Sequence, residues 1–196
     1  ALMDHPNIAR ILDAGTTAAG VPFFVMELVD GDPITEFCDR ERLTVRERLG
    51  LLRSTCQAVQ HAHRKGVIHR DLKPSNILVA QSESGPIVKV IDFGVAKALE
   101  GSLSSMTIHT GAHQLLGTPL YMSPEQLEPG NIDIDTRSDV FSLGVLLYEL
   151  LTGTTPVERE LAKRGGLIEF RQVIENEESR RPSRRVTTLA EVAAAT

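Results

Sequence analysis

Four short apolar runs, at residues 8–13, 23–29, 77–79 and 87–91, are rich in β-branched and aromatic side chains and predict β-strands. A turn of Gly, Thr and Ala residues at 15–20 separates the first two runs, so we expect them to form an antiparallel pair. Gly31-Asp32-Pro33 is expected to break the second strand. The polar residues 81–86 separate the last two runs and predict a hairpin with a long turn.

Two further segments have helical signals. Residues 44–47 match a capping box, and apolar residues at 45, 49, 52, 56 and 59 continue with helical spacing, which predicts an amphipathic helix over 45–65 ended by Gly66. Cys56 lies on this stripe, so we expect it to pack in the core. A second helix, 138–151, has a capping signal at 136–139, is apolar on nearly every face and stops at Gly153. A helix this apolar is expected to be buried in an α-rich lobe.

Composition narrows the class of protein. A chain of 196 residues with 41% hydrophobic residues is long enough for one sizeable core, and a net charge of −5 argues against a nucleic-acid partner. Cys38 and Cys56 have no metal-ligand spacing and read as reduced thiols, which favours a cytoplasmic setting. No apolar run reaches the roughly 20 residues that cross a bilayer, so we expect no membrane insertion by this chain, although a longer parent could be anchored elsewhere.

The polar loop between the apolar residues 67–68 and 77–79 carries the candidate chemistry. Asp71, Lys73 and Asn76 fall within six positions, and Asp92 follows the last apolar run. A carboxylate can orient a hydroxyl and accept its proton, an ammonium can stabilise a transferring phosphate, and Mg²⁺ prefers oxygen ligands. Taken singly, Asn76 or the triplet at 92–94 is equally compatible with an ordinary turn.

The order of the motifs removes this ambiguity. His69-Arg70-Asp71-Leu72-Lys73-Pro74-Ser75-Asn76, Asp92-Phe93-Gly94, Ser123-Pro124-Glu125 and the run 139–144 together resemble the eukaryotic-type protein kinases. The lysine at position 73 makes the chain resemble serine/threonine kinases in particular. The residues at 60–63 and 121–126 are similar to those of bacterial members of the family. The resemblance implies an α+β fold that is mostly the helical C-lobe, with the last two strands of the N-lobe sheet.

The resemblance also implies a division of the chain and its ligands. Residues 1–29 would be the remnant of the N-lobe, made of the end of the αC helix, two strands and the hinge. Residues 30–175 would be the C-lobe with the catalytic loop and activation segment, and 176–196 a charged tail. The implied ligands are ATP and Mg²⁺, and the implied partners are proteins with Ser or Thr acceptors.

Site roles follow by resemblance. Asp71 is the expected catalytic base, Lys73 the phosphate contact, and Asn76 and Asp92 the metal ligands. The run 23–29 resembles the hinge strand, in which the backbone at Glu27 and Val29 would meet adenine and Met26 would be the gatekeeper. Leu78 would form the floor under the base. Without the resemblance, this run is a buried strand and Leu78 a core leucine.

Residues 92–125 correspond to the activation segment. Arg70 could pair with a phosphate added there, with Thr107 and Thr110 as first candidates for autophosphorylation and Ser102, Ser104 and Ser105 after them. Thr118 resembles the substrate-facing threonine. Asp139 resembles the buried residue that holds the catalytic loop's backbone, and a helix-cap role, which is the local interpretation, could coexist with it. Glu125 is expected to pair with a later arginine, which the sequence does not identify.

Several kinase parts are missing from the sequence. It contains no G-x-G-x-x-G, and all five lysines follow the hinge, whereas the family places its phosphate lysine before it. The αC-helix glutamate that would hold this lysine is not found either. We therefore expect a piece of a longer kinase that is nearly inactive by itself, with strands at 8–29 that exchange amide hydrogens faster than the helix at 140–151. A catalytically dead scaffold is the rival hypothesis, but retention of the residues at 71, 73, 76 and 92 argues against it. The arginines at 180–185 around Ser183 could form a docking or phosphoacceptor tail, but a solvated linker is the simpler interpretation.

Overall fold

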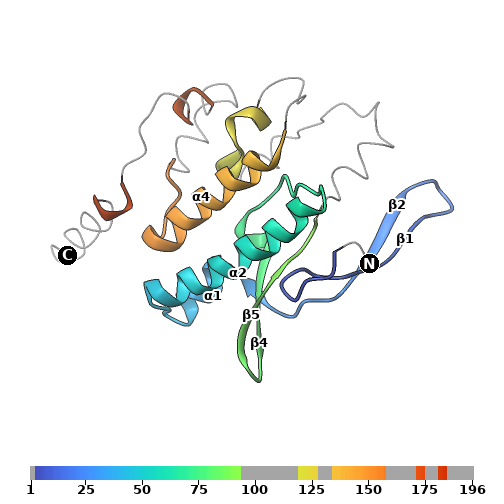
Figure 1. The fold of residues 1–196 in the computed structure, drawn as a ribbon, viewed down its shortest axis with the longest axis horizontal. Coiled ribbons are helices and arrows are strands. Elements are labelled where there is room, and N and C mark those ends of the chain that lie inside the picture. Colours follow the sequence, from blue (N-terminus) through green and yellow to red (C-terminus); the bar gives the residue numbers. More distant parts are fainter. Residues whose placement is uncertain (1–2, 94–118, 128–133, 158–170, 175–180, 185–196) are drawn as a thin grey trace.

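The computed structural model describes residues 3–93, 119–127, 134–157, 171–174 and 181–184. Thr107, Thr110, Thr118 and most of the predicted tail lie outside these ranges. Figure 1 shows a helical part, in which the long helices α2 and α4 lie side by side, and a β-hairpin near the N-terminus that projects away from it. No helix among the described residues is long and apolar enough to span a bilayer.

The predicted N-terminal strand pair is confirmed, with shifted bounds. β1 (Ile11–Thr16) pairs antiparallel with β2 (Pro22–Met26) in a sheet of two strands. The first strand begins later than predicted because Ile8 is buried and bridges Val90 instead. Ala9 N donates to Val90 O at 2.9 Å, and Val90 N donates to Asn7 O at 2.8 Å. These bonds tie the hairpin to the rest of the molecule.

A second sheet has the order β3-β4-β5. The predicted hairpin consists of β4 (Ile77–Ser82) and β5 (Gly85–Val90), whose strands are longer and whose turn is shorter than expected. β3 (Asp32–Pro33) was not predicted, and it pairs with β4 at Val79 and Leu78. A Cβ at Gly31 would lie 2.7 Å from the carbonyl oxygen of Val79, so this close approach requires glycine.

Helix α1 (Ile34–Arg40) was also missed by the sequence analysis. It has only seven residues, too few for a periodic signal, and its first residue follows a proline. Ile34, Phe37 and Cys38 are nevertheless almost completely buried. Arg48 fixes its end by donating to Cys38 O at 3.2 Å and to Asp39 Oδ1 at 2.8 Å.

Helix α2 (Val45–Arg64) has the predicted start and stop. Glu47 N donates to Thr44 Oγ1, Thr44 N donates to Glu47 Oε2 at 2.8 Å, and Gly66 has a φ of +72°. The predicted apolar stripe was partly wrong, because Val45, Leu49 and Cys56 are exposed. The buried face is Leu51, Leu52, Thr55, Ala58, Val59 and Ala62. It includes small side chains, which allow close packing on α4, and a search for large apolar residues overlooks them.

Helix α4 (Thr136–Thr152) is the buried helix that the sequence predicted, and it ends at Gly153 with a φ of +75°. Its N-cap is Asp135, whose Oδ1 accepts from Arg137 N at 2.7 Å, so the predicted cap at 136–139 was wrong. The burial is also less uniform than predicted. Val140 is 62% exposed, whereas Ser138, Asp139 and Ser142 are buried. Asp139 accepts hydrogen bonds from the loop at residues 69–70, while Ser138 and Ser142 donate to the segment 119–127.

Candidate active site

The loop that joins α2 to β4 brings three predicted site residues together. Lys73 Nζ lies 2.7 Å from Asp71 Oδ2, and Asn76 Nδ2 donates to the same oxygen at 3.0 Å and to the Asp71 carbonyl oxygen at 2.8 Å. The 3₁₀ turn Pro74–Asn76 positions the asparagine, with proline at its first position. The Asp71 side chain is 42% exposed, so its carboxylate remains open to an acceptor group.

The buried carboxylate of Asp139 on α4 fixes the backbone of this loop. Its oxygens accept from His69 N at 2.9 Å and from Arg70 N at 2.8 Å, and His63 Nε2 on α2 lies 2.6 Å away. Asp139 has no exposed surface. The predicted backbone-holding role is therefore confirmed. The N-cap of α4 is Asp135, and Asp139 lies in the first turn of the helix. His63 and Asp139 are 76 positions apart in the sequence, so no local pattern links them.

His69 is a neutral structural residue within the loop. It is 1% exposed, and burial lowers its pKa. Its Nε2 lies 2.9 Å from the Ile91 carbonyl oxygen, to which it donates, and its Nδ1 accepts from Asp71 N at 3.3 Å. One donor and one acceptor match the neutral imidazole. The ring also packs edge-on against Phe93 at 4.7 Å between centroids.

The two predicted metal ligands, Asn76 and Asp92, are brought near each other by a backbone hydrogen bond between their segments. Ile91 N donates to Asn76 O at 3.0 Å, and Asp92 is the residue that follows Ile91. Asn76 uses its Nδ2 on Asp71, so Oδ1 is its remaining atom for a cation. The described residues contain no cluster of three or more His, Cys, Asp or Glu side chains that could hold a metal. One carboxylate and one amide oxygen fit Mg²⁺ that is shared with phosphates.

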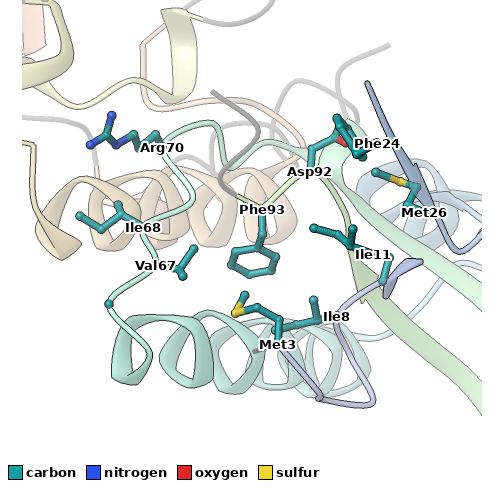
Figure 2. A pocket seen from close by; sticks show the side chains of 12 residues that line it. Met3, Ile8, Ile11, Phe24, Met26, Val67, Ile68, Arg70, Asp92 and Phe93 are labelled. Carbon is teal, nitrogen blue, oxygen red and sulfur yellow. The ribbon is translucent and has the colours of Figure 1, made fainter. Parts of the chain in front are cut away.

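An apolar cavity of about 330 Å³ lies between the hairpin and the loop (Figure 2). Of the predicted nucleotide-site residues, Met26 and Asp92 line it, while Glu27, Val29 and Leu78 are not among its described lining residues. Figure 2 shows the Phe93 ring beside Val67 and above Met3 and Ile8 in this view. The remaining lining residues are Ala9, Ile11, Phe24, Gly66, Ile68 and Arg70.

The side chain of Glu27 connects three segments. Its Oε1 lies 2.8 Å from Lys89 Nζ on β5, and its Oε2 accepts from Arg10 N at 3.1 Å. The hydrogen bond from Lys89, followed by the one from Arg10, lowers the pKa of Glu27. This carboxylate therefore holds the end of β2 against the second sheet. Glu27 and Lys89 are 62 positions apart, so no local sequence pattern predicts their interaction.

The segment 119–127 packs against α4 and reaches the loop. Ser142 Oγ donates to Tyr121 O at 2.7 Å, Tyr121 Oη donates to Glu149, and Ser138 Oγ donates to Glu125 Oε1 at 2.5 Å. In the described residues Glu125 thus bonds a serine, and an arginine partner remains a prediction. Gln126 Nε2 donates to Arg70 O at 2.6 Å. In the sequence, Gln126 stands out only as part of the bacterial-like run 121–126, because its partner Arg70 is 56 positions away.

Comparison with known proteins finds a matching family model and similar relatives. The protein kinase domain family matches residues 1–193. The chain is 41% identical over 160 residues to serine/threonine-protein kinase PknB of Mycobacterium tuberculosis, covering 80% of this chain and 24% of that protein. It is 40% identical over 161 residues to serine/threonine-protein kinase Pkn1 of Myxococcus xanthus, covering 81% and 22%. It is 37% identical over 173 residues to serine/threonine-protein kinase A of Synechocystis, covering 83% and 32%. The chain thus spans about a quarter to a third of these relatives.

Proposed function

The chain belongs to the protein kinase domain family, and from this premise we propose that it supplies the acceptor-positioning and metal-binding part of a serine/threonine protein kinase. The reaction is transfer of the γ-phosphate of ATP to a Ser or Thr hydroxyl of a protein. One observation carries the proposal: Asp71, Lys73 and Asn76 converge within 3.0 Å on a loop that a buried carboxylate holds.

In the proposed mechanism, Asp71 orients the acceptor hydroxyl and takes its proton as the oxygen forms its bond to phosphorus. The Lys73 ammonium stabilises negative charge on the transferring group. Mg²⁺, held by Asn76 Oδ1 and Asp92, would neutralise the phosphate oxygens. The partly exposed Asp71 carboxylate supports this assignment, because a fully buried base could not meet a protein substrate.

The remaining site roles stay part of the proposal. Met26 would border the adenine pocket as gatekeeper, the backbone of Glu27 and Val29 would contact the base, and Leu78 would lie beneath it. Arg70 would pair with phosphate on Thr107 or Thr110, and Thr118 would face the substrate. The placement of Met26 and Asp92 at one cavity supports the nucleotide assignment.

We also propose the division into 1–29, 30–175 and 176–196, a cytoplasmic setting, and near-inactivity of the 196-residue polypeptide alone. Both cysteines are free thiols, which supports the cytoplasmic setting. The sequence has neither a glycine-rich phosphate loop nor a lysine before the hinge, which supports near-inactivity.

The Asp71→Asn variant tests the function in the complete gene product that carries these residues. We expect kcat for phosphorylation of a Ser/Thr peptide to fall about 10²- to 10⁴-fold, because the amide cannot accept the proton. The melting temperature should change little, since the side chain is partly exposed. Asp30→Asn, at an exposed position, is the matched control.

Full activity of the Asp71→Asn variant would contradict the assignment of the base. A wild-type protein that binds ATP but transfers no phosphate would instead favour the scaffold function. Measuring nucleotide binding and phosphate transfer on the same preparation separates these two results.

A further inference from the structure

We propose that Gln126 is a positioning residue for the reaction, which fixes the peptide bond preceding Asp71 and couples the turn at 123–127 to the catalytic base. This inference rests on the proposed function, because it assigns Asp71 as the base. Gln126 itself touches neither the Asp71 carboxylate nor its partners Lys73 and Asn76 in the contacts described above. It acts through the carbonyl oxygen of Arg70.

The two ends of the Gln126 amide have opposite partners, so its orientation is determined. Oε1 accepts from Ser123 N at 3.0 Å and from Ser123 Oγ at 3.1 Å, while Nε2 donates to Arg70 O at 2.6 Å. The reverse orientation would place an amide oxygen against a carbonyl oxygen and an NH₂ against an N–H. The short donor-acceptor distance to Arg70 O indicates a close contact between turn and loop.

The peptide unit between Arg70 and Asp71 is held at both of its polar atoms. Gln126 donates to its oxygen, and its N–H donates to Nδ1 of the buried His69 at 3.3 Å. Asp139 holds the preceding N–H of Arg70. Arg70 has a φ of +71°, a left-handed conformation that is unfavourable for a residue with a Cβ. These three bonds maintain that conformation, which sets the direction in which Asp71 leaves the backbone.

The turn that carries Gln126 is itself fixed to α4. Ser123 is completely buried, and Glu125 on the same turn accepts from Ser138 at 2.5 Å. Helix α4 therefore holds the loop through Asp139 and the turn through Ser138, and Gln126 connects the loop and the turn directly. A displacement of the turn would move the Arg70 carbonyl and with it the Asp71 carboxylate.

Two substitutions separate positioning from simple stabilisation of the turn. Gln126→Glu keeps an oxygen for both Ser123 donors but loses the donation to Arg70 O and places two acceptors against each other. Ser123→Ala is the matched control, since it loses the hydroxyl contact and leaves the bond from Gln126 to Arg70 intact. Gln126→Met, of similar size and unable to donate, is the second variant if the glutamate substitution prevents folding.

The measurements use the complete gene product that carries these residues. For Gln126→Glu or Gln126→Met we expect kcat to fall about 10- to 100-fold, because small errors in the placement of a catalytic group have effects of this size. The KM for ATP should stay within about twofold, since the phosphate-binding groups are unchanged. The carbonyl ¹³C resonance of Arg70 should move upfield as its hydrogen bond is lost. Ser123→Ala should leave kcat and this resonance close to wild type.

Three outcomes decide the inference. A fall in kcat that is equal in Gln126→Glu and Ser123→Ala would overturn it, because the residue would then only stabilise the turn. An unmoved Arg70 carbonyl resonance would overturn it as well. A wild-type protein without phosphate transfer would overturn the proposed function and the positioning role with it, and the resonance would still report separately whether Gln126 holds the loop.

Discussion

Two regions of the molecule hold candidate site residues, and they differ in how they are stabilised. One is the β1–β2 hairpin, and the other, here called the frame, is helix α4 with the catalytic-loop residues 69–76 and the segment 119–127. The frame buries polar groups that are bonded to one another, such as Asp139 with the amides of His69 and Arg70. In the hairpin every residue of β1 is exposed, and large apolar side chains such as Leu12 and Phe23 face solvent at 64% and 43% exposure. The proposed acceptor-positioning residues therefore lie in a unit that is held by buried hydrogen bonds, while the proposed adenine contacts lie in a weakly supported one.

Hydrogen exchange should show the largest difference between the two regions. Amides of β1 and β2 should exchange at least about 10²-fold faster than those of α4, because an isolated two-stranded sheet is only marginally stable. The β4–β5 hairpin is the matched control, since its strands are of similar length but Val79, Val88 and Val90 are buried. Mass-spectrometric or NMR exchange would measure this, and equal protection of β1–β2 and α4 would refute the comparison.

Removing the central carboxylate of the frame should have the next largest effect. We expect Asp139→Ala to lower the free energy of unfolding by about 3–5 kcal/mol, because His63 and two backbone N–H groups lose a buried partner. Asp135→Ala on the same helix should lower it by only about 1 kcal/mol through loss of the N-cap. Urea denaturation followed by circular dichroism measures both, and similar losses would show that the frame does not depend on Asp139.

The smallest expected effect concerns the attachment of the hairpin through Glu27. Glu27→Gln should ease opening of β1–β2 by no more than about 1 kcal/mol near neutral pH, since the Lys89–Glu27 pair is partly exposed. Interaction with Lys89 lowers the pKa of Glu27 below its usual 4.5. The stabilisation by the carboxylate is thus fully present above pH 4.5 and is lost as pH falls through the lower, folded-state pKa.

Exchange rates of the hairpin amides, normalised to intrinsic rates at each pH, measure this effect. The wild type and Glu27→Gln should differ near neutral pH and converge once Glu27 is protonated. A difference that does not depend on pH would show that the ion pair does not hold the hairpin.

Much of the fold follows from local signals in the sequence. The capping box at Thr44, the stop at Gly153 and the alternation of strands with turns all predicted elements that the structure contains. The errors share a cause. Each depends on which neighbouring element covers a residue or on a single side-chain hydrogen bond, and the periodicity of apolar residues contains no information on either. The cases are the exposed Cys56, the short helix α1 and the N-cap at Asp135.

The sequence by itself determined the family, the identity of the candidate base, phosphate contact and metal ligands, and the order of the main strands and helices. These follow from residue types and spacings along one stretch of chain. Only the tertiary structure decided how that stretch is held. Gln126 meets Arg70 across 56 positions, Asp139 meets His69 across 70, and Glu27 meets Lys89 across 62. Such bonds form between groups that folding brings within about 3 Å, and no local pattern of residues encodes that distance.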